Sequence, residues 1–428
     1  MNGVSLAASV VVGASLFGAA WLDETWLGQA WSAADLGHQV AQVPSAPADG
    51  LGATPLLRWA VSLPGLPRPV AAPVEPATPV VNGAEIYVGY SGAHALLVLG
   101  RRDGSLVDSL EARAPVASAP VFATDDQLVF ADAAGYTSAW TRSPGAPWKR
   151  AWEHYSGAPI LSSPRVVDGV VYIANVDELV YALDLASGEL RWRHQHKLDA
   201  ARTAALELFG APAPAVAGDT VYAGFSDGFL VALDRASGSE RWQAQVGEGT
   251  YPDLIGAPVP LPQGGVLVGG YSKPLMRLDT ATRSPAWRLD IGSAAAALLE
   301  GEIAYQPGAD GQLRCIDTRT GEQKWTWDSG SSGPLLTPQL TRQGLLVAST
   351  DATIYLLDPG TGARTWSLDG AAVGTENLGG VSFTGFAANP GLAGDEIYAV
   401  SNGGKLYALR GRAPVAGPSP VPWVDAEP

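Results

Sequence analysis

The chain has 428 residues and a formal net charge of −15, with only 16% charged residues but 51 Gly and 33 Pro. The acidic balance argues against a nucleic-acid partner, because phosphate binding requires a basic stripe and the sequence has none. Abundant Gly and Pro among few charges is typical of many short strands joined by tight turns, so the composition favours an all-β protein over a helical one.

The N-terminal part of the chain contains an apolar run, Val4 to Leu22, without a charged side chain. As a helix this run would span about 29 Å, close to the hydrocarbon thickness of a bilayer. It lacks the Lys or Arg of an ordinary export signal, and a misassigned start or a buried segment is the alternative interpretation. We predict that residues 1–31 are an export signal or a membrane anchor through residues 4–22. The rest of the protein would then be extracytoplasmic, in the periplasm or cell envelope.

Two irregular segments flank the main body of the chain. Residues 32–54 mix Ala, Gly, Pro and polar residues without sustained periodicity, which predicts a linker. Residues 413–428 are rich in Pro and are expected to form an irregular tail.

Between these segments, residues 55–412 repeat one pattern. An alternating apolar strand ends in Asp, and a Trp follows eight residues later, in five places: Asp184 and Trp192, Asp234 and Trp242, Asp279 and Trp287, Asp317 and Trp325, Asp358 and Trp366. Four of the five have Ser-Gly or Thr-Gly between the two residues, and Gly supplies the positive φ of a hairpin turn. We interpret the Asp residues as turn residues and the Trp residues as blade-to-blade packing, with a ligand cage as the alternative for Trp.

Further strands precede each of these units. Asp168-Gly169 lies between two apolar runs and predicts a hairpin, which brings the unit to four strands. Three degenerate units place Gly100, Thr141 and Arg410 where the others have Asp. Eight units of roughly forty residues with four strands each predict an eight-bladed β-propeller.

The ends of the repeat array indicate how the ring closes. The last unit lacks its Trp strand, while Arg58-Trp59-Ala60-Val61 precedes the first unit as a spare one. A propeller removes its exposed sheet edge when such a strand completes the final blade. We therefore expect the strand around Trp59 to pair with the final unit.

The segment from Tyr181 to Trp192 resembles the PQQ-type repeat, in which Tyr-Ala-Leu-Asp is followed by Ser-Gly-Glu and Trp. The layout, with a Trp strand first and none last, is closest to the BamB-like propellers of outer-membrane protein assembly. The resemblance covers residues 55–412. It implies a non-catalytic scaffold without a cofactor, whose partners are envelope proteins, among them a β-barrel assembly factor.

The resemblance also suggests where a partner would bind. BamB-like proteins hold their barrel-forming partner near the connection between the third and fourth blades, where the family has Leu-x-Leu-Arg-Gly. The matching residues here are Leu206-Glu207-Leu208-Phe209-Gly210, with Phe209 in place of Arg. Leu206, Leu208 and Phe209 are thus implied as partner-binding residues, and a buried strand start is the alternative.

A second function is binding of PQQ or another small ligand, as in a sensor or a quinoprotein dehydrogenase. The dehydrogenases that the repeat resembles pack a vicinal Cys–Cys disulfide on PQQ, and this chain has a single cysteine, Cys315. We therefore predict no enzyme activity and assign no catalytic, cofactor or metal residues. Cys315 lies in an apolar strand pattern and should be buried. His194-Gln195-His196 has a spacing that metals can use, but without a third ligand it predicts surface histidines.

Overall fold

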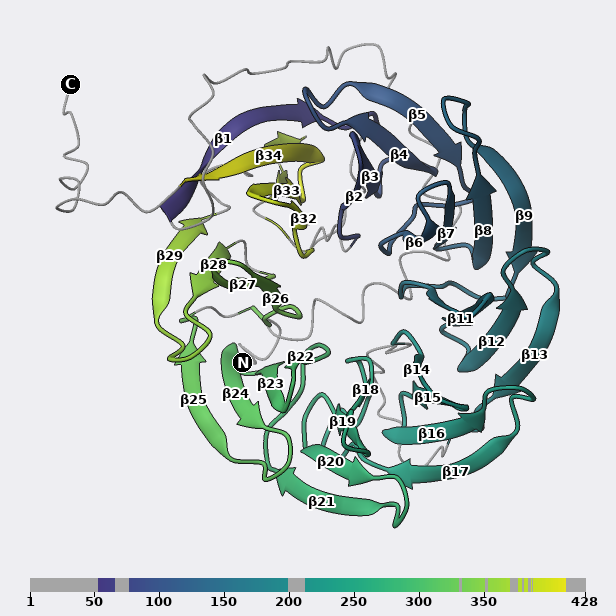
Figure 1. Ribbon diagram of the computed structural model, residues 1–428, viewed down its shortest axis with the longest axis vertical. Helices are drawn as coiled ribbons and strands as arrows, with labels where there is room; N and C mark the ends of the chain where they lie inside the picture. Colours follow the sequence, from purple (N-terminus) through teal and green to yellow (C-terminus); the bar gives the residue numbers. More distant parts are fainter. Residues whose placement is uncertain are drawn as a thin grey trace, which may run out of the picture.

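The computed structural model describes residues 53–65, 77–198, 212–330, 333–350, 353–369, 376–378, 381–383, 386 and 388–412. Every regular element within these ranges is a β-strand. Eight antiparallel four-stranded sheets surround a common axis, as Figure 1 shows, and this confirms the predicted eight-bladed propeller.

Each of the first four blades is formed from consecutive strands. Blade 1 contains β2 (Val80–Asn82), β3 (Glu85–Gly89), β4 (Ala95–Gly100) and β5 (Leu106–Glu111). Blade 2 contains β6 (Val121–Thr124), β7 (Gln127–Ala131), β8 (Tyr136–Thr141) and β9 (Lys149–Tyr155). Blade 3 contains β10 (Arg165–Val167), β11 (Val170–Ala174), β12 (Leu179–Asp184) and β13 (Leu190–Gln195). Blade 4 contains β14 (Ala215–Ala217), β15 (Thr220–Gly224), β16 (Phe229–Asp234) and β17 (Glu240–Gln245).

The next three blades follow the same order. Blade 5 contains β18 (Val259–Pro260), β19 (Val266–Gly269), β20 (Leu275–Asp279) and β21 (Ser284–Leu289). Blade 6 contains β22 (Leu298–Glu300), β23 (Ile303–Pro307), β24 (Gln312–Asp317) and β25 (Gln323–Asp328). Blade 7 contains β26 (Gln339–Thr341), β27 (Gly344–Ala348), β28 (Thr353–Leu357) and β29 (Arg364–Asp369).

Blade 8 joins the two ends of the array. It contains β32 (Gly391–Ala393), β33 (Glu396–Val400), β34 (Lys405–Arg412) and, as its outermost strand, β1 (Ala53–Ser62). Strand β1 runs antiparallel to β34, with Ala53 opposite Arg412 and Trp59 opposite Ala408. The predicted closure by the strand around Trp59 is therefore confirmed, and it removes the open sheet edges that an uncapped array would expose.

The hydrophobic core lies between the blades. All five residues of β11 are buried, whereas in the rim strand β13 only Trp192 is buried and four residues are exposed. The second strand of a blade is covered on both faces because each blade packs against a neighbour on either side, and the sequence of β11 is accordingly apolar throughout. One core cluster, for example, joins Val180 and Trp192 of blade 3 to Val221 and Val231 of blade 4.

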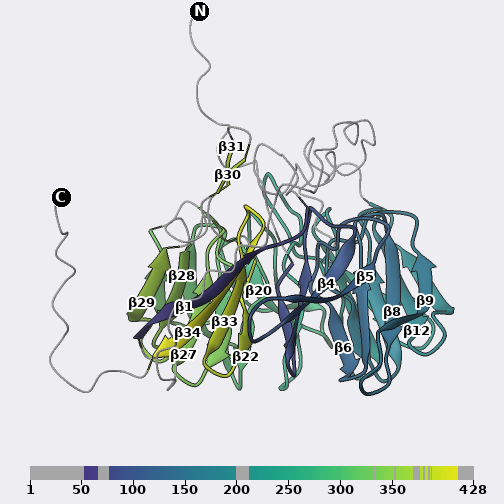
Figure 2. The same ribbon diagram turned by 90° about the horizontal axis from the view of Figure 1, so that it is seen from above.

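The ring has two different ends. The turns between first and second strands and between third and fourth strands lie at one end, which we call the turn face. The turns between second and third strands lie at the opposite end with the connections from blade to blade, and we call it the connection face. A short hairpin of β30 (Glu376–Leu378) and β31 (Val381–Phe383) stands clear of the blades in Figure 2.

Membrane anchoring was predicted through residues 4–22, which lie outside the described ranges. Within those ranges the structure contains no helix that is long and apolar enough to span a bilayer.

Candidate functional site

The five repeated Asp residues all lie in the turns between third and fourth strands. The Asp184 carboxylate accepts hydrogen bonds from the backbone N–H groups of Ala186 and Ser187, both at 3.0 Å, and from the Ser187 hydroxyl at 3.1 Å. A bond from Arg191 together with these turn contacts lowers the Asp184 pKa to about 2. The pKa values of Asp234, Asp279, Asp317 and Asp358 are lowered as well. A carboxyl that stays ionised at neutral pH cannot act as a general acid.

The rim Trp residues dock onto the turn of the following blade. Trp192 Nε1 donates to the Arg235 carbonyl at 2.9 Å, and the indole lies over Gly238, where an added Cβ would be 2.5 Å from the ring. The same contact pairs Trp152 with Gly188, Trp287 with Gly321, Trp325 with Gly362 and Trp59 with Gly104. These turns need glycine for two reasons: the residue has a left-handed φ near 70° to 77°, and it lies in close contact with an indole.

Two repeat Trp residues have different surroundings. Trp242 is half-buried and packs with Tyr222 at a ring-centroid distance of 6.0 Å. In the turn of the next blade, Arg283 takes the place of Gly with a φ of 58°. Trp366 is buried in blade 7 in a cluster that includes Leu409 of blade 8.

Blade 1 carries Asp108 at the rim position where the other blades have Trp, opposite Val98. Trp148, from the turn of blade 2, is buried in the core cluster that this junction forms. Its ring meets Tyr87 of blade 1 edge-on at 6.0 Å, and the Arg142 guanidinium stacks over it at 4.5 Å. Trp148 lies outside the repeat pattern, although the three additional residues in the turn before Trp152 are a sequence signal for it.

The two histidines of blade 3 are not surface residues, so that prediction was wrong. His196 is 7% exposed, its Nε2 lies 2.9 Å from Asp227 Oδ2, and its ring stacks on Phe225 with centroids 4.3 Å apart. His194 is half-buried, and desolvation lowers its pKa. Interactions with blade 4 explain both positions, because His196 contacts Phe225 and Asp227 and the His194 ring interacts electrostatically with Glu240. Cys315, by contrast, is buried as predicted.

A buried polar cluster lies on the connection face where blades 3 and 4 meet. We define the blade 3–4 cluster as Glu178, His196, Ser226 and Asp227, all less than 9% exposed. Ser226 donates a hydrogen bond to Glu178, and His196 pairs with Asp227. Among the described residues no group of three metal-binding side chains has the arrangement of a metal site. The hydrogen bond of Ser226 and the His196–Asp227 pair both join blade 3 to blade 4, so the cluster holds the two blades together.

Glu178 is strained as well as buried. Its φ is 62°, in the left-handed region, and the same turn position holds Gly135, Gly228, Gly311 and Gly404 in blades 2, 4, 6 and 8. A non-Gly residue there costs about 1–2 kcal/mol that glycine would not. Such strain is retained at functional sites more often than elsewhere. Aligning the repeats would have shown a Glu at this glycine position, so the sequence contained the signal.

The predicted contact residues Leu206, Leu208 and Phe209 lie outside the described residues. The blade 3–4 cluster nevertheless lies at the start of their segment, since Leu198 is the last described residue before it and Pro212 the first after it. His196 is therefore anchored to blade 4 only two residues before the chain enters this connection.

The comparisons with known proteins agree on the fold. A family model described as outer membrane protein assembly factor BamB matches residues 99–326 and 250–426. Proteins of that name from Yersinia pestis and Moranella endobia are 25% and 23% identical over 266 residues, or 60% of this chain. The chain spans 63% and 64% of the length of these two relatives.

Solved structures show the same architecture. BamB from Moraxella catarrhalis matches with a TM-score of 0.65 and 17% identity, over 83% of this chain and 100% of that one. A quinohemoprotein alcohol dehydrogenase from Comamonas testosteroni matches with a TM-score of 0.61 and 14% identity, over 86% of this chain and 78% of that one. At these identities the likeness concerns the fold alone.

Proposed function

Since the chain belongs to the family of outer membrane protein assembly factor BamB, we propose that it is a non-catalytic scaffold of the cell envelope. Its partner would be a protein of the outer-membrane assembly machinery, such as a β-barrel assembly factor. Residues 4–22 would export the propeller or anchor it outside the cytoplasm. A rigid ring with loops on both ends suits docking without chemistry.

The observation that carries this proposal is the strained, buried Glu178 beside the blade 3–4 connection. Its left-handed φ would cost less with glycine, so a role beyond folding explains why a carboxylate stands there. Together with the His196–Asp227 pair, it fixes the base of the segment that contains Leu206, Leu208 and Phe209. We infer that the cluster positions this segment for an apolar contact with the partner.

Quinoprotein chemistry is the weaker proposal. The fold is shared with quinohemoprotein alcohol dehydrogenases, but fold alone does not carry function. The sequence has a single cysteine, Cys315, which is buried in β24, so a vicinal disulfide is excluded.

The test is retention of partners by the tagged full-length protein from gently solubilised native membranes, identified by mass spectrometry. The Leu206→Asp/Leu208→Asp variant should lose an assembly protein that the parent retains. The matched control is Leu190→Asp/Leu340→Asp, because these leucines are 46% and 42% exposed on other parts of the ring. Equal retention by both double variants, or no envelope protein retained by the parent, would refute the proposal.

A further inference from the structure

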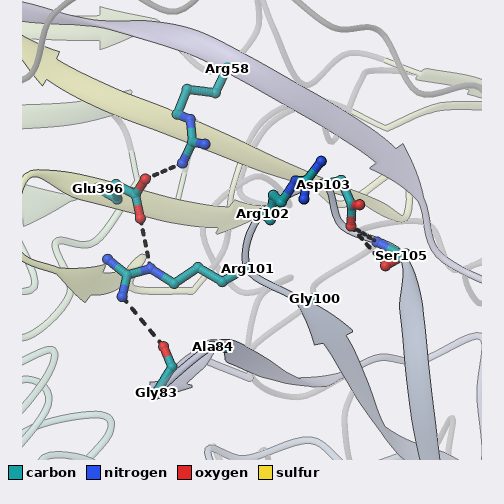
Figure 3. Close-up of a pocket in the computed structure, with 9 residues that line it drawn as sticks. All are labelled: Arg58, Gly83, Ala84, Gly100, Arg101, Arg102, Asp103, Ser105 and Glu396. Atoms are coloured by element: carbon teal, nitrogen blue, oxygen red, sulfur yellow. Dashed lines mark hydrogen bonds and ion pairs between the residues drawn. The ribbon is translucent and has the colours of Figure 1, made fainter.

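A shallow cavity of about 620 Å³ lies on the turn face where blade 8 meets blade 1. Figure 3 shows its lining: Arg58, Gly83, Ala84, Gly100, Arg101, Arg102, Asp103, Ser105 and Glu396. Arg58 comes from the closing strand β1, Glu396 begins β33, and the other residues belong to the two turns of blade 1. The cavity is therefore built across the ring closure.

The cavity is lined by more positively charged than negatively charged side chains. Glu396, whose side chain is 9% exposed, accepts hydrogen bonds from Arg58, from Arg101 Nε at 2.7 Å and from the Tyr398 hydroxyl at 2.6 Å. The remaining Arg101 nitrogens donate to the carbonyls of Gly83 and Ala393. Arg101 is thus fully engaged in holding the two blades together.

Arg102 differs from Arg101 because it is exposed and hydrogen-bonds to none of the described residues, although its charge acts on the neighbouring Asp103 carboxylate. The neighbouring Asp103 is held by the Ser105 backbone N–H at 3.0 Å and hydroxyl at 2.7 Å, which lower its pKa. Three arginines against two carboxylates leave one positive charge in the cavity of a protein whose net charge is −15. The donors that remain available are those of Arg102 and the guanidinium nitrogens of Arg58 that do not meet Glu396.

The turn of blade 1 differs from the corresponding turns in its first residue. Blades 4 and 6 also carry an arginine in this turn, Arg235 and Arg319, but Asp234 and Asp317 begin those two turns. In blade 3 the same turn is Asp184-Leu185-Ala186-Ser187-Gly188, and in blade 1 it is Gly100-Arg101-Arg102-Asp103-Gly104. Gly104 keeps its left-handed φ and its contact with Trp59, so the turn has kept its shape. The Asp that five other blades carry at its start is replaced by Gly, and Arg102 stands where blade 3 has Ala186.

We propose that this cavity is a phosphate-binding site, in which Arg102 and Arg58 take the phosphodiester of an anionic lipid headgroup or a free phosphate. The planar guanidinium matches phosphate oxygens in pairs, which is the recognition that two nearby arginines offer. The position favours the lipid source, because β1 enters the ring on this turn face at Ala53, and the apolar run 4–22 precedes it in the chain.

Isothermal titration calorimetry of the full chain in neutral maltoside micelles tests the proposal. Inorganic phosphate, dihexanoyl phosphatidylglycerol and dihexanoyl phosphatidylcholine are titrated separately. We expect the phosphatidylglycerol to bind and phosphate to compete with it, while the zwitterionic lipid binds more weakly. Binding of phosphate without either lipid would assign the same site to a free anion.

Arg102→Gln tests the site, and Arg342→Gln is its matched control. Arg342 is also an exposed arginine in a turn on the turn face, in blade 7. Arg102→Gln should weaken binding about tenfold, the effect of one charge-assisted hydrogen bond, and Arg342→Gln should not. Equal thermal unfolding of the two variants confirms that both are folded. Absence of anion binding, or equal weakening by both variants, would overturn the proposal. Neither outcome bears on partner retention, which depends on the opposite face.

Discussion

A rim Trp docks onto the turn glycine of the next blade at five junctions, and the stability that this contact contributes can be predicted. Gly188 and Gly169 lie in two turns of blade 3 with almost identical φ values of 74° and 73°. An added Cβ at Gly188 would lie 2.5 Å from the Trp152 ring, whereas at Gly169 it would have no atom within 4 Å. Alanine at either site must adopt the left-handed conformation, at about 1–2 kcal/mol. Only Gly188→Ala must also displace an indole, at about 1–3 kcal/mol for overpacking.

We therefore expect Gly188→Ala to lower the free energy of unfolding by about 2–5 kcal/mol and Gly169→Ala by about 1–2 kcal/mol. Urea unfolding of the two variants and the parent, followed by far-ultraviolet circular dichroism, gives both differences. The shared backbone cost cancels in the comparison, so the remainder measures the Trp contact. If the two variants lose the same stability, docking of Trp152 on Gly188 does not stabilise the junction between blades 2 and 3.

Three further predictions concern residues in which blades 1 to 3 differ from the repeat. Trp148→Ala should lower the free energy of unfolding by about 3–5 kcal/mol in a urea titration, because the indole fills the junction of blades 1 and 2; a loss under about 1 kcal/mol would contradict this. Burial lowers the His154 pKa, so the folded state binds fewer protons and stability should fall as the pH drops below about 6.5. His154→Leu, which copies Leu110 of blade 1, should reduce the difference in urea midpoint between pH 7.5 and pH 5.5, and an unchanged difference would exclude His154 as its source. Glu178→Gly should relieve a strained φ and keep or raise the thermal midpoint, yet reduce partner retention in the pull-down; undiminished retention would show that the cluster does not position the docking segment.

The architecture was predictable because its signals are periodic. A Trp eight residues after Asp recurs in five blades, and the turn glycines repeat with it, so even the degenerate units could be placed by their spacing. The ring closure followed from counting strands, since the last unit lacked one and Trp59 stood before the first. The apolar pattern of a strand indicates which of its residues face the adjacent blade. Every blade of a propeller packs against a similar blade, so the same pattern recurs around the ring.

The polar contacts between blades were less predictable, because they join residues distant in the sequence. Nothing local to His196 indicates that Asp227 lies 2.9 Å away, and nothing near Arg101 indicates Glu396. Both contacts arise only when the ring brings blade 3 against blade 4 and blade 8 against blade 1. The spacing His-x-His suggested surface residues because a rim strand was assumed to stay at the rim along its whole length, whereas its far end packs over the next blade.

The junction between the degenerate blades 1 and 2 shows which part of the repeat the packing between blades requires. The junction of blades 1 and 2 has Asp108 in the Trp position, yet it contains an indole supplied by Trp148 from the other side. An ion pair of Arg142 with Glu85 at 2.6 Å crosses the same junction. The interface thus needs an aromatic volume and does not depend on which blade provides it. The turn of blade 1 packs on Trp59 of blade 8, and it carries Arg101 and Arg102 without the Asp that begins this turn in five other blades.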